Sequence, residues 1–427
     1  MAASNMSLLI RKVKVIDTQS PFHNKIVDIL IENGKIVSIA SSITSKAKRE
    51  INLKGLHISP GFVDVFADYC EPGYEHKETL QSGLLQAVAG GYTEVFLAPN
   101  TQPTLSNKTA LEYILKNTEN DLVTVHPIGS ITQKIEGKAL AEMYDMNKSG
   151  AIAFSDGWHP VQHPGLMLKA LEYVKAFQGI LIQLPLDESL AVGGLMHEGQ
   201  LSTKLGMPGI PNLAETTILH RDIELLRYTQ SRLHITGIST EEGVNMIRKA
   251  KKEGLQITCS VTPYHLMFND SMLKDYNSLY KVCPVLRSEK DRLALIKGLK
   301  EGTIDCIASH HRPQDWDAKV KEFEYAADGM NVQQITASIL LSELSDKLPL
   351  ERIIEAMTTA PRAIFGLEKV DIMEGSSANC CLYLPETSFT VETENLYSQS
   401  QNNPFIGATL KGKIIGTIHK NQSQFKY

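Results

Sequence analysis

Four side chains of the kinds that bind metals or carry protons come at the ends of apolar segments. They are Asp68, Asp156, His310 and His311. Carboxylates and imidazoles together suit zinc, manganese or iron, and a histidine can also act as a general base near neutral pH. The four residues are therefore candidates for a metal or catalytic site, if the fold brings them together.

The elements that must position these residues alternate between short apolar segments and amphipathic helical patterns. Helical spacing is seen, for example, in 78–89, 165–177, 241–253 and 288–299. Eight such units predict an α/β fold, a closed (β/α)8 TIM barrel with its active site at the carboxyl ends of the strands. The apolar segments are 62–68, 93–98, 122–128, 151–155, 180–184, 233–238, 256–262 and 303–309.

Both ends of the chain are instead rich in short strands without helical spacing. We predict that these ends pair into one small β-sandwich domain. The predicted strands are 8–16, 27–32, 35–39, 379–384 and 412–419.

The chain therefore divides into two predicted domains. The composite β-domain takes residues 1–58 and 367–427, and the barrel takes residues 59–366. Met6 is an alternative start, which would leave residues 1–5 as a disordered extension.

Composition excludes several classes of protein. The 427 residues carry a formal net charge of -5, without a basic stripe, so we expect no nucleic-acid partner. No apolar run approaches the roughly 18 residues of a membrane helix, and no signal peptide is evident. Six scattered cysteines without a C-x-x-C motif favour a reduced, cytoplasmic protein. The adjacent Cys380 and Cys381 should face opposite sides of a strand.

Short motifs along the chain stand in the order and spacing of one family. The first, at 59–64, joins the N-terminal strands to the first barrel strand. Together the motifs resemble the type I dihydroorotases of the amidohydrolase superfamily, over nearly the whole chain. The resemblance implies a TIM barrel of the metal-dependent hydrolase type. The other motifs are 71–73, 77–79, 90–93, 99–103, 153–156, 205–211, 262–266, 286–292 and 403–405.

Dihydroorotases belong to pyrimidine biosynthesis, where they interconvert carbamoyl-aspartate and dihydroorotate. The resemblance implies a zinc centre, which lowers the pKa of a bound water to about 7 and polarises the carbonyl. It also implies an aspartate that moves the proton and an arginine that grips the substrate carboxylate.

Most of the implied zinc ligands are replaced in this chain. The His-x-His pair of the first strand falls on Phe66 and Asp68, positions that share one face of a strand. The strand-five histidine falls on Leu184, or on Gln183 if the register slips by one residue. The strand-six histidine falls on Gly237. All three expected histidine ligands are therefore lost.

Two residues of the family's site motifs are retained. Asp156 matches the metal-bridging carboxylate, although an aspartate before a glycine also commonly starts a turn. His234 matches the first histidine of the strand-six pair. A lone histidine in an apolar strand is more often a core residue than a ligand, and we interpret His234 in that way.

The proton-moving aspartate falls on His310, in a segment where His311 matches the family and Gln314 replaces a substrate-side histidine. The arginine that grips the carboxylate falls on Cys70, whose thiol cannot form the paired hydrogen bonds of a guanidinium. We therefore name no catalytic residue beyond the position of His310.

Asparagine positions that contact substrate in the family are partly kept. Asn100 is retained, and its alternative role is to cap the turn before Thr101. The later asparagine falls on Cys283.

The first hypothesis is a dihydroorotase-family protein without catalytic activity. It would be a structural or regulatory partner of aspartate carbamoyltransferase, the preceding enzyme of the pathway, and would also form a homo-oligomer. On this hypothesis we expect no cofactor.

The alternative is an active dihydroorotase, or a hydrolase of another cyclic amide, with a non-standard metal centre. Asp68, Asp156, His310 and His311 would then be the ligand candidates and zinc the expected metal. A third hypothesis is a small-molecule sensor that uses the old pocket.

Overall fold

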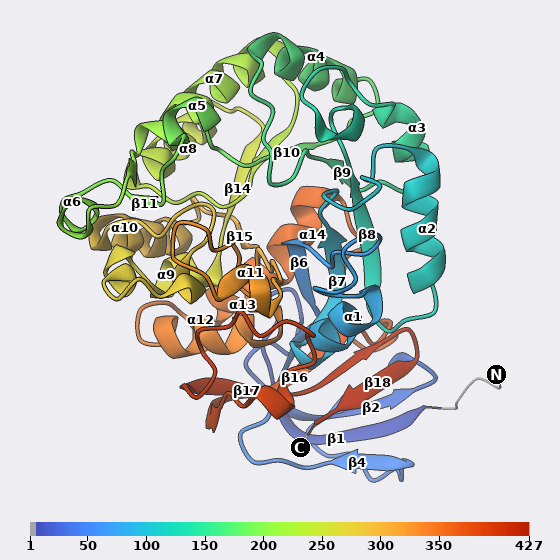
Figure 1. The fold of residues 1–427 in the computed structure, drawn as a ribbon. Coiled ribbons are helices and arrows are strands. Elements are labelled where there is room, and N and C mark those ends of the chain that lie inside the picture. Colours follow the sequence, from blue (N-terminus) through green and yellow to red (C-terminus); the bar gives the residue numbers. More distant parts are fainter. Residues whose placement is uncertain (1–5, 427) are drawn as a thin grey trace.

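The middle of the chain forms a parallel barrel. The computed structural model describes residues 6–426 and places eight strands around the barrel in sequence order (Figure 1). The predicted TIM barrel is confirmed, and each strand overlaps the apolar segment predicted for it. The strands are β6 (Phe62–Ala67), β7 (Tyr92–Leu97), β8 (Thr124–Gly129), β9 (Ala153–Phe154), β10 (Leu181–Gln183), β13 (Leu233–Ile235), β14 (Ile257–Val261) and β15 (Cys306–Ile307).

The barrel closes where the segment after β15 meets the first strand. Ala67 at the end of β6 forms a parallel bridge with His311. The Asp68 N–H donates to the His311 carbonyl at 2.9 Å, and the His310 N–H donates to the Phe66 carbonyl at 3.1 Å. This closure sets candidate residues of the first and last barrel segments side by side.

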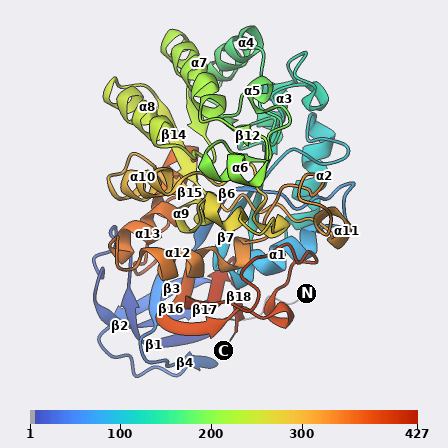
Figure 2. The ribbon, with the colours of Figure 1, turned by 60° about the vertical axis from the view of Figure 1, so that its left-hand side comes forward.

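Helices cover the outside of the barrel (Figures 1 and 2). Thr79 and Ser288 form capping boxes at the first turns of α1 and α10, which satisfy N–H groups that have no partner within the helix. The α-helices are α1 (Leu80–Ala89), α2 (Lys108–Thr118), α3 (Met143–Lys148), α4 (Pro164–Lys175), α5 (Glu188–Ala191), α6 (Gln200–Leu205), α7 (Leu213–Thr229), α8 (Glu241–Lys252), α9 (Pro263–Met267), α10 (Glu289–Lys300), α11 (Trp316–Lys319), α12 (Thr336–Leu344), α13 (Leu350–Met357) and α14 (Thr359–Phe365).

Smaller elements complete the barrel domain and the C-terminal segment. Between β10 and α7 the chain adds a two-stranded parallel sheet, β11 (Met196–His197) with β12 (Gly209–Ile210). The short 3-10 helices are η1 (Gln133–Ile135), η2 (Asp270–Leu273), η3 (Ser278–Tyr280), η4 (Gln333–Ile335) and η5 (Thr393–Asn395). Along residues 6–426, none of the helices combines the length and apolar character that a membrane crossing requires.

Strands from both termini form one eight-stranded sheet beside the barrel. Strand β16 pairs antiparallel with both β5 and β17, which joins the C-terminal strands to the N-terminal ones. In order across the sheet, with β4 (Arg49–Ile51) beside β1, the strands are β18 (Gln422–Phe425), β17 (Thr409–His419), β16 (Cys380–Thr390), β5 (His57–Pro60), β1 (Ser7–Val15), β2 (Ile26–Glu32) and β3 (Lys35–Ala40).

The small domain built from both termini is thus confirmed. Its residue boundaries at 58/59 and 366/367 stay a prediction, and the prediction for residues 1–5 lies outside the described residues. Cys380 packs in the core of the terminal sheet, whereas Cys381 packs in the core of the barrel. This is the alternation expected for neighbours on a strand, and it places β16 between the two cores.

Candidate functional site

An aromatic cluster fills the carboxyl end of the barrel. The Phe66 ring lies 5.0 Å from both the Trp158 and the His310 rings, measured between centroids, and the latter two rings lie 5.4 Å apart. All three residues are buried. The Arg312 guanidinium lies 4.6 Å from the centre of the Trp158 ring. The aromatic cluster of Phe66, Trp158 and His310 thus occupies the end of the barrel where an active site was predicted.

His310 is fixed in this cluster by its backbone and by its ring. Its φ is +47°, in the left-handed region where Asn, Asp and His are enriched among residues other than glycine. Its Nε2 lies 2.7 Å from Thr236 Oγ1. A Cβ at Gly237 would lie 2.6 Å from His310 Cε1. The imidazole therefore takes the space that a side chain at position 237 would need.

A chain of hydrogen bonds runs from His310 across β13 and β14, through buried groups as far as His234. Thr236 Oγ1 and Ser260 Oγ lie 3.1 Å apart, and Ser260 Oγ lies 3.1 Å from His234 Nε2. His234 Nδ1 lies 2.8 Å from Thr258 Oγ1. As predicted, His234 is a core residue, with both ring nitrogens hydrogen-bonded.

Burial keeps these two imidazoles neutral. It is the main cause that lowers the pKa of His310 to about 3, with smaller contributions from His265, Arg312 and His234. Burial also lowers the pKa of His234 to about 3, with a smaller effect of Lys251. A base of such low pKa is poorly matched to proton abstraction at neutral pH.

The Asp156 carboxylate hydrogen-bonds to the loop that follows β8. Its Oδ1 accepts hydrogen bonds from the Ile131 and Thr132 N–H groups, both at 2.9 Å, and its Oδ2 accepts one from the Thr132 hydroxyl. Burial raises the pKa of Asp156 to about 6 against the opposing effect of these hydrogen bonds. The residue therefore anchors a loop in this structure.

Asp68 and Cys70 are also engaged with the protein. The Asp68 carboxylate accepts from the Cys70 N–H at 2.8 Å and from Trp158 Nε1 at 3.2 Å. Burial raises the pKa of the Cys70 thiol well above its usual value, so the thiol stays protonated. Position 70 thus offers neither the charge nor the fork of donors that would grip a substrate carboxylate.

Asn100 holds the turn that carries Asp156 and Trp158. Its Nδ2 donates to the Asp156 carbonyl, and its Oδ1 accepts from the Trp158 N–H, both at 3.2 Å. Gly157 between them has a φ of +63°, and a Cβ there would lie 1.6 Å from Asn100 Oδ1. Both ends of the amide are therefore used to hold backbone.

His311 belongs to a different polar cluster, next to α1. Its Nε2 lies 2.7 Å from Gln86 Nε2 and 3.6 Å from Glu78 Oε2. His311 and Glu78 are both fully buried. The neighbouring His310 points instead into the aromatic cluster, so the two adjacent histidines serve separate groups of residues.

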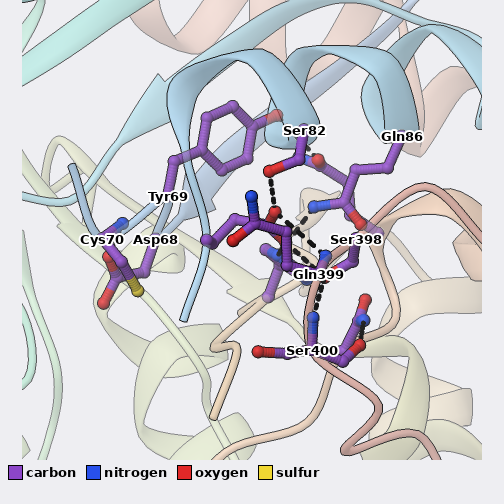
Figure 3. Close-up of polar contacts among 12 residues, drawn as sticks. Asp68, Tyr69, Cys70, Ser82, Gln86, Ser398, Gln399 and Ser400 are labelled. Carbon is purple, nitrogen blue, oxygen red and sulfur yellow. Dashed lines mark hydrogen bonds and ion pairs between the residues drawn. The ribbon is translucent and has the colours of Figure 1, made fainter. Parts of the chain in front are cut away.

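The same Glu78 ties α1 to the C-terminal segment. The Ser82 and Ser398 hydroxyls donate to its carboxylate, and the Gln399 N–H donates to Oε1 at 3.3 Å. Figure 3 shows Ser82 on α1 facing Ser398 and Gln399. This cluster joins distant parts of the chain beside the carboxyl end of the barrel.

The four candidate residues do not converge on one point. Asp68 and His310 both contact Trp158, Asp156 anchors the loop after β8, and His311 lies in the cluster beside α1. Across the part of the chain that the structure describes, no group of three or more His, Cys, Asp or Glu side chains is arranged to hold a metal.

Comparison with known proteins supports the resemblance found in the sequence. A family model described as Dihydro-orotase-like matches residues 55–243. The dihydroorotase of Syntrophus aciditrophicus is 40% identical over 417 residues, 97% of this chain and 98% of that protein. This chain belongs to the dihydroorotase family. The dihydroorotase of Acetivibrio thermocellus is 37% identical over 414 residues, 96% of this chain and 97% of that protein.

Several solved structures share the fold of this chain. The L-hydantoinase (dihydropyrimidinase) from Arthrobacter aurescens has a TM-score of 0.85 at 20% identity, over 99% of this chain and 98% of that chain. A D-hydantoinase (dihydropyrimidinase) from Thermus sp. has a TM-score of 0.82 at 20% identity, over 98% and 96% of the two chains. The likeness extends over the barrel and the terminal sheet together.

The residues at the positions that the resemblance assigns to zinc do not fit that metal. Phe66, Leu184 and Gly237 have no side-chain donor atom, whereas zinc in proteins takes three or four side-chain ligands from His, Cys, Asp and Glu. The oxygens of Asp156 already accept three hydrogen bonds from the protein. These positions therefore do not form the centre that the resemblance implied.

The expectation of no cofactor nevertheless needs correction. It rested on lost ligand positions alone. Relatives 40% and 37% identical to nearly the whole chain are dihydroorotases, and dihydroorotases use zinc for their chemistry. Family membership is thus evidence for a metal, which the expectation disregarded.

Trp158 and Thr236 shape this end of the barrel, and the sequence pattern did not single them out. Trp158 contacts Phe66 and His310 and donates to Asp68. One signal was available for it, because the chain has only two tryptophans and this one follows a predicted strand end. Thr236 had no such signal, since its role depends on the position of His310.

Any side chain at position 237 is expected to destabilise the protein, because His310 fills the space. Gly237 has a φ of +73°, which already disfavours a side chain. The close approach to His310 adds an overpacking cost. We expect Gly237→Ala to lower the free energy of unfolding by about 1 kcal/mol more than a left-handed glycine without close neighbours does. Urea denaturation measures the difference.

Gly254→Ala is the matched control for this substitution. Gly254 has a φ of +83°, and no described atom lies within 4 Å of its Cβ position. Equal losses of stability in the two variants would contradict the role assigned to His310.

Proposed function

We propose that this chain is a dihydroorotase-family protein of pyrimidine biosynthesis that does not turn over dihydroorotate. It acts as a structural or regulatory partner of aspartate carbamoyltransferase in the cytoplasm, and it also associates with itself. The observation that carries the proposal is the aromatic cluster of Phe66, Trp158 and His310. It places buried rings where a dihydroorotase needs a polar, accessible site.

The replaced substrate positions support the same conclusion. Cys70 is a buried, protonated thiol. The Asn100 side-chain amide is hydrogen-bonded to the turn at Gly157. His310 is a weak base. The groups that would bind the substrate carboxylate, orient the substrate and transfer the proton are thus each altered or already engaged. The fold is nevertheless kept, and the chain covers 98% of the Syntrophus aciditrophicus dihydroorotase.

An exposed apolar area beside α5 and α7 is a suitable centre for a partner interface. Leu190, Val192 and Leu213 are 41%, 80% and 62% exposed. The two helix starts are adjacent, because the Asp187 N–H donates to the Ala214 carbonyl at 2.7 Å. Apolar side chains gathered on a surface commonly mark a protein contact, and stable interfaces bury about 1,600 Å² around such a centre.

Co-expression with aspartate carbamoyltransferase of the same organism tests the proposal. The two chains are expected to elute together from size-exclusion chromatography, with a mass by light scattering above that of either protein alone. Val192→Asp combined with Leu213→Asp is expected to weaken the complex by about tenfold or more, because charges would enter the apolar centre. Affinity is measured by titration calorimetry.

Tyr228→Asp is the matched control, since Tyr228 is 76% exposed at the other end of α7. It is expected to leave the complex intact. Separate elution of the two unmodified proteins at micromolar concentration, with transferase activity unchanged by this chain, would remove the partner role.

The alternative is an active cyclic-amide hydrolase with a non-standard centre. Its support is the retained Asp156 and the orphan Nδ1 of His310, which no described residue hydrogen-bonds. Turnover of dihydroorotate that depends on either side chain would establish it in place of the inactive form.

A further inference from the structure

An open groove of about 960 Å³ lies between α11 and the C-terminal segment 399–402. This volume is in the range of small-molecule sites. Cys70, Asn100 and the aromatic cluster do not line the groove, whereas Gln314, at a substrate-side position of the family, does, so the groove borders the replaced catalytic centre. Uncharged amide and hydroxyl side chains are frequent in its wall, among them Asn277, Ser278, Gln314, Gln399, Ser400 and Asn402.

One amide in this wall is buried with unused hydrogen-bonding capacity. Gln314 is only 5% exposed, and its Oε1 accepts no hydrogen bond from the described residues. The amide is held in place, because its Nε2 donates to the Asp328 carbonyl at 2.8 Å and its backbone N–H donates to Asn402 Oδ1 at 3.1 Å. One acceptor and the second Nε2 hydrogen remain for a ligand. Leaving such a buried acceptor unpaired costs stability.

An aromatic face lines the same groove. Trp316 is 71% exposed, although large aromatic residues are usually mostly buried. It opens α11, where the Asp315 carboxylate caps the helix by accepting from the Ala318 N–H at 2.9 Å. An exposed indole is a platform on which a flat ring can stack.

The charges in the wall favour an uncharged ligand. Asp315 and Glu322 balance Lys319 and Lys321. Lys319 is buried and donates to the carbonyls of Ala327 at 2.9 Å and Gly329 at 3.2 Å, so its ammonium group is already used. A phosphate would find Lys321 and His76 at most, with Asp315 only 3.6 Å from the His76 ring nitrogen.

We propose that this groove binds a nucleoside. A glutamine amide pairs with the edge of a base that presents a donor beside an acceptor, and the base ring stacks on the indole of Trp316. The hydroxyl groups of the sugar suit the exposed amide side chains of Gln399 and Gln401 in the same wall. The site goes beyond the partner role proposed above and does not depend on it.

Titration of the full-length protein with adenosine and with uridine tests this site. The intrinsic fluorescence reports directly, because the chain has two tryptophans and Trp158 is buried. Saturable quenching is expected with at least one nucleoside, and calorimetry should give one site per chain. AMP should bind no more tightly than adenosine, and maltose, which has hydroxyl groups without a base, should not bind.

Variants separate this groove from other binding. Trp316→Ala is expected to weaken nucleoside binding about tenfold, the usual scale for loss of one stacked base. Gln314→Met should also weaken it while keeping the side-chain length. Tyr325→Ala is the matched control, since Tyr325 is 67% exposed but does not line the groove. Its affinity should equal that of the unmodified protein.

Three results would overturn the assignment. They are no saturable binding of either nucleoside at millimolar concentration, binding of maltose in place of the nucleosides, and undiminished affinity in Trp316→Ala. Thermal melts of each variant show whether the fold is intact, and loss of the carbamoyltransferase complex would have no bearing on these outcomes.

Discussion

Incubated with dihydroorotate, the purified chain is expected to form carbamoyl-aspartate at least about 10⁴-fold more slowly than an active dihydroorotase. The reason is that several catalytic functions are altered together. The substrate grip at position 70 is a protonated thiol, and the base at position 310 has a pKa of about 3. The Syntrophus aciditrophicus relative, 40% identical, is the reference enzyme to assay beside it.

Partial restoration is expected to fail. The double variant Phe66→His with Asp68→His returns the first pair of family residues but leaves Leu184, Gly237 and Cys70 unchanged. Groups that act as a unit in catalysis do not contribute additively, so activity should stay at background. Spectrophotometric assay at neutral pH, with thermal melts to verify folding, measures this.

Turnover by the unmodified chain that Asp156→Asn abolishes would refute the inactive form. Asp156 anchors the loop after β8, so a merely unfolded variant must be excluded by its melting curve. Thr132→Val is a useful second variant, because it removes the hydroxyl contact with Asp156 and leaves the carboxylate in place.

The barrel and the composite terminal domain could be predicted because their signals are local. Each strand is a short apolar run, and side-chain alternation is a property of a strand by itself. Cys380 and Cys381 illustrate this, since one faces the terminal core and the other the barrel core. The end residues of short strands were less well defined, as in β15, where tertiary contacts and not local sequence decide where pairing stops.

The candidate site was harder to predict because its residues meet only after folding. Trp158 reaches Phe66 and His310 from a loop after another strand, and no spacing rule connects the three. The left-handed φ of His310 decides that its ring points over Gly237, which sequence alone did not show. Asn100 was left with two roles, and its contacts with the turn were visible only in the structure.

Replacing His310 and replacing Asp156 are expected to change the pH dependence of stability in opposite directions. The folded pKa of His310 is lowered from 6.5 to about 3, by burial above all. Between pH 6.5 and 3 the His310 imidazole is therefore protonated in the unfolded chain and neutral in the folded chain. The stabilisation present above pH 6.5 is lost as the pH falls towards 3. That loss is about 2 kcal/mol between pH 6.5 and 5.

The variant His310→Gln has no imidazole to protonate at this position, so it does not lose this stability. The difference in unfolding free energy between the variant and the unmodified protein, here called the stability gap, should narrow by about 2 kcal/mol from pH 6.5 to 5. Asp156 has the opposite sign. Burial raises its folded pKa from 3.8 to about 6, so its favourable contribution is complete below 3.8 and is lost as the pH rises through 6. The gap for Asp156→Asn should widen by about 1 kcal/mol over the same interval.

Urea denaturation at half-unit steps of pH measures both gaps. Differences between each variant and the unmodified protein cancel the titration of all other groups, provided that the denatured states are alike. His220→Gln is the control, because His220 is exposed on α7 and lies outside the aromatic cluster. A gap for His310→Gln that stays constant from pH 6.5 to 5 would mean that His310 takes up a proton as readily in the folded protein as in the unfolded one. The aromatic cluster would then be open to water, and the central support for the inactive form would be lost.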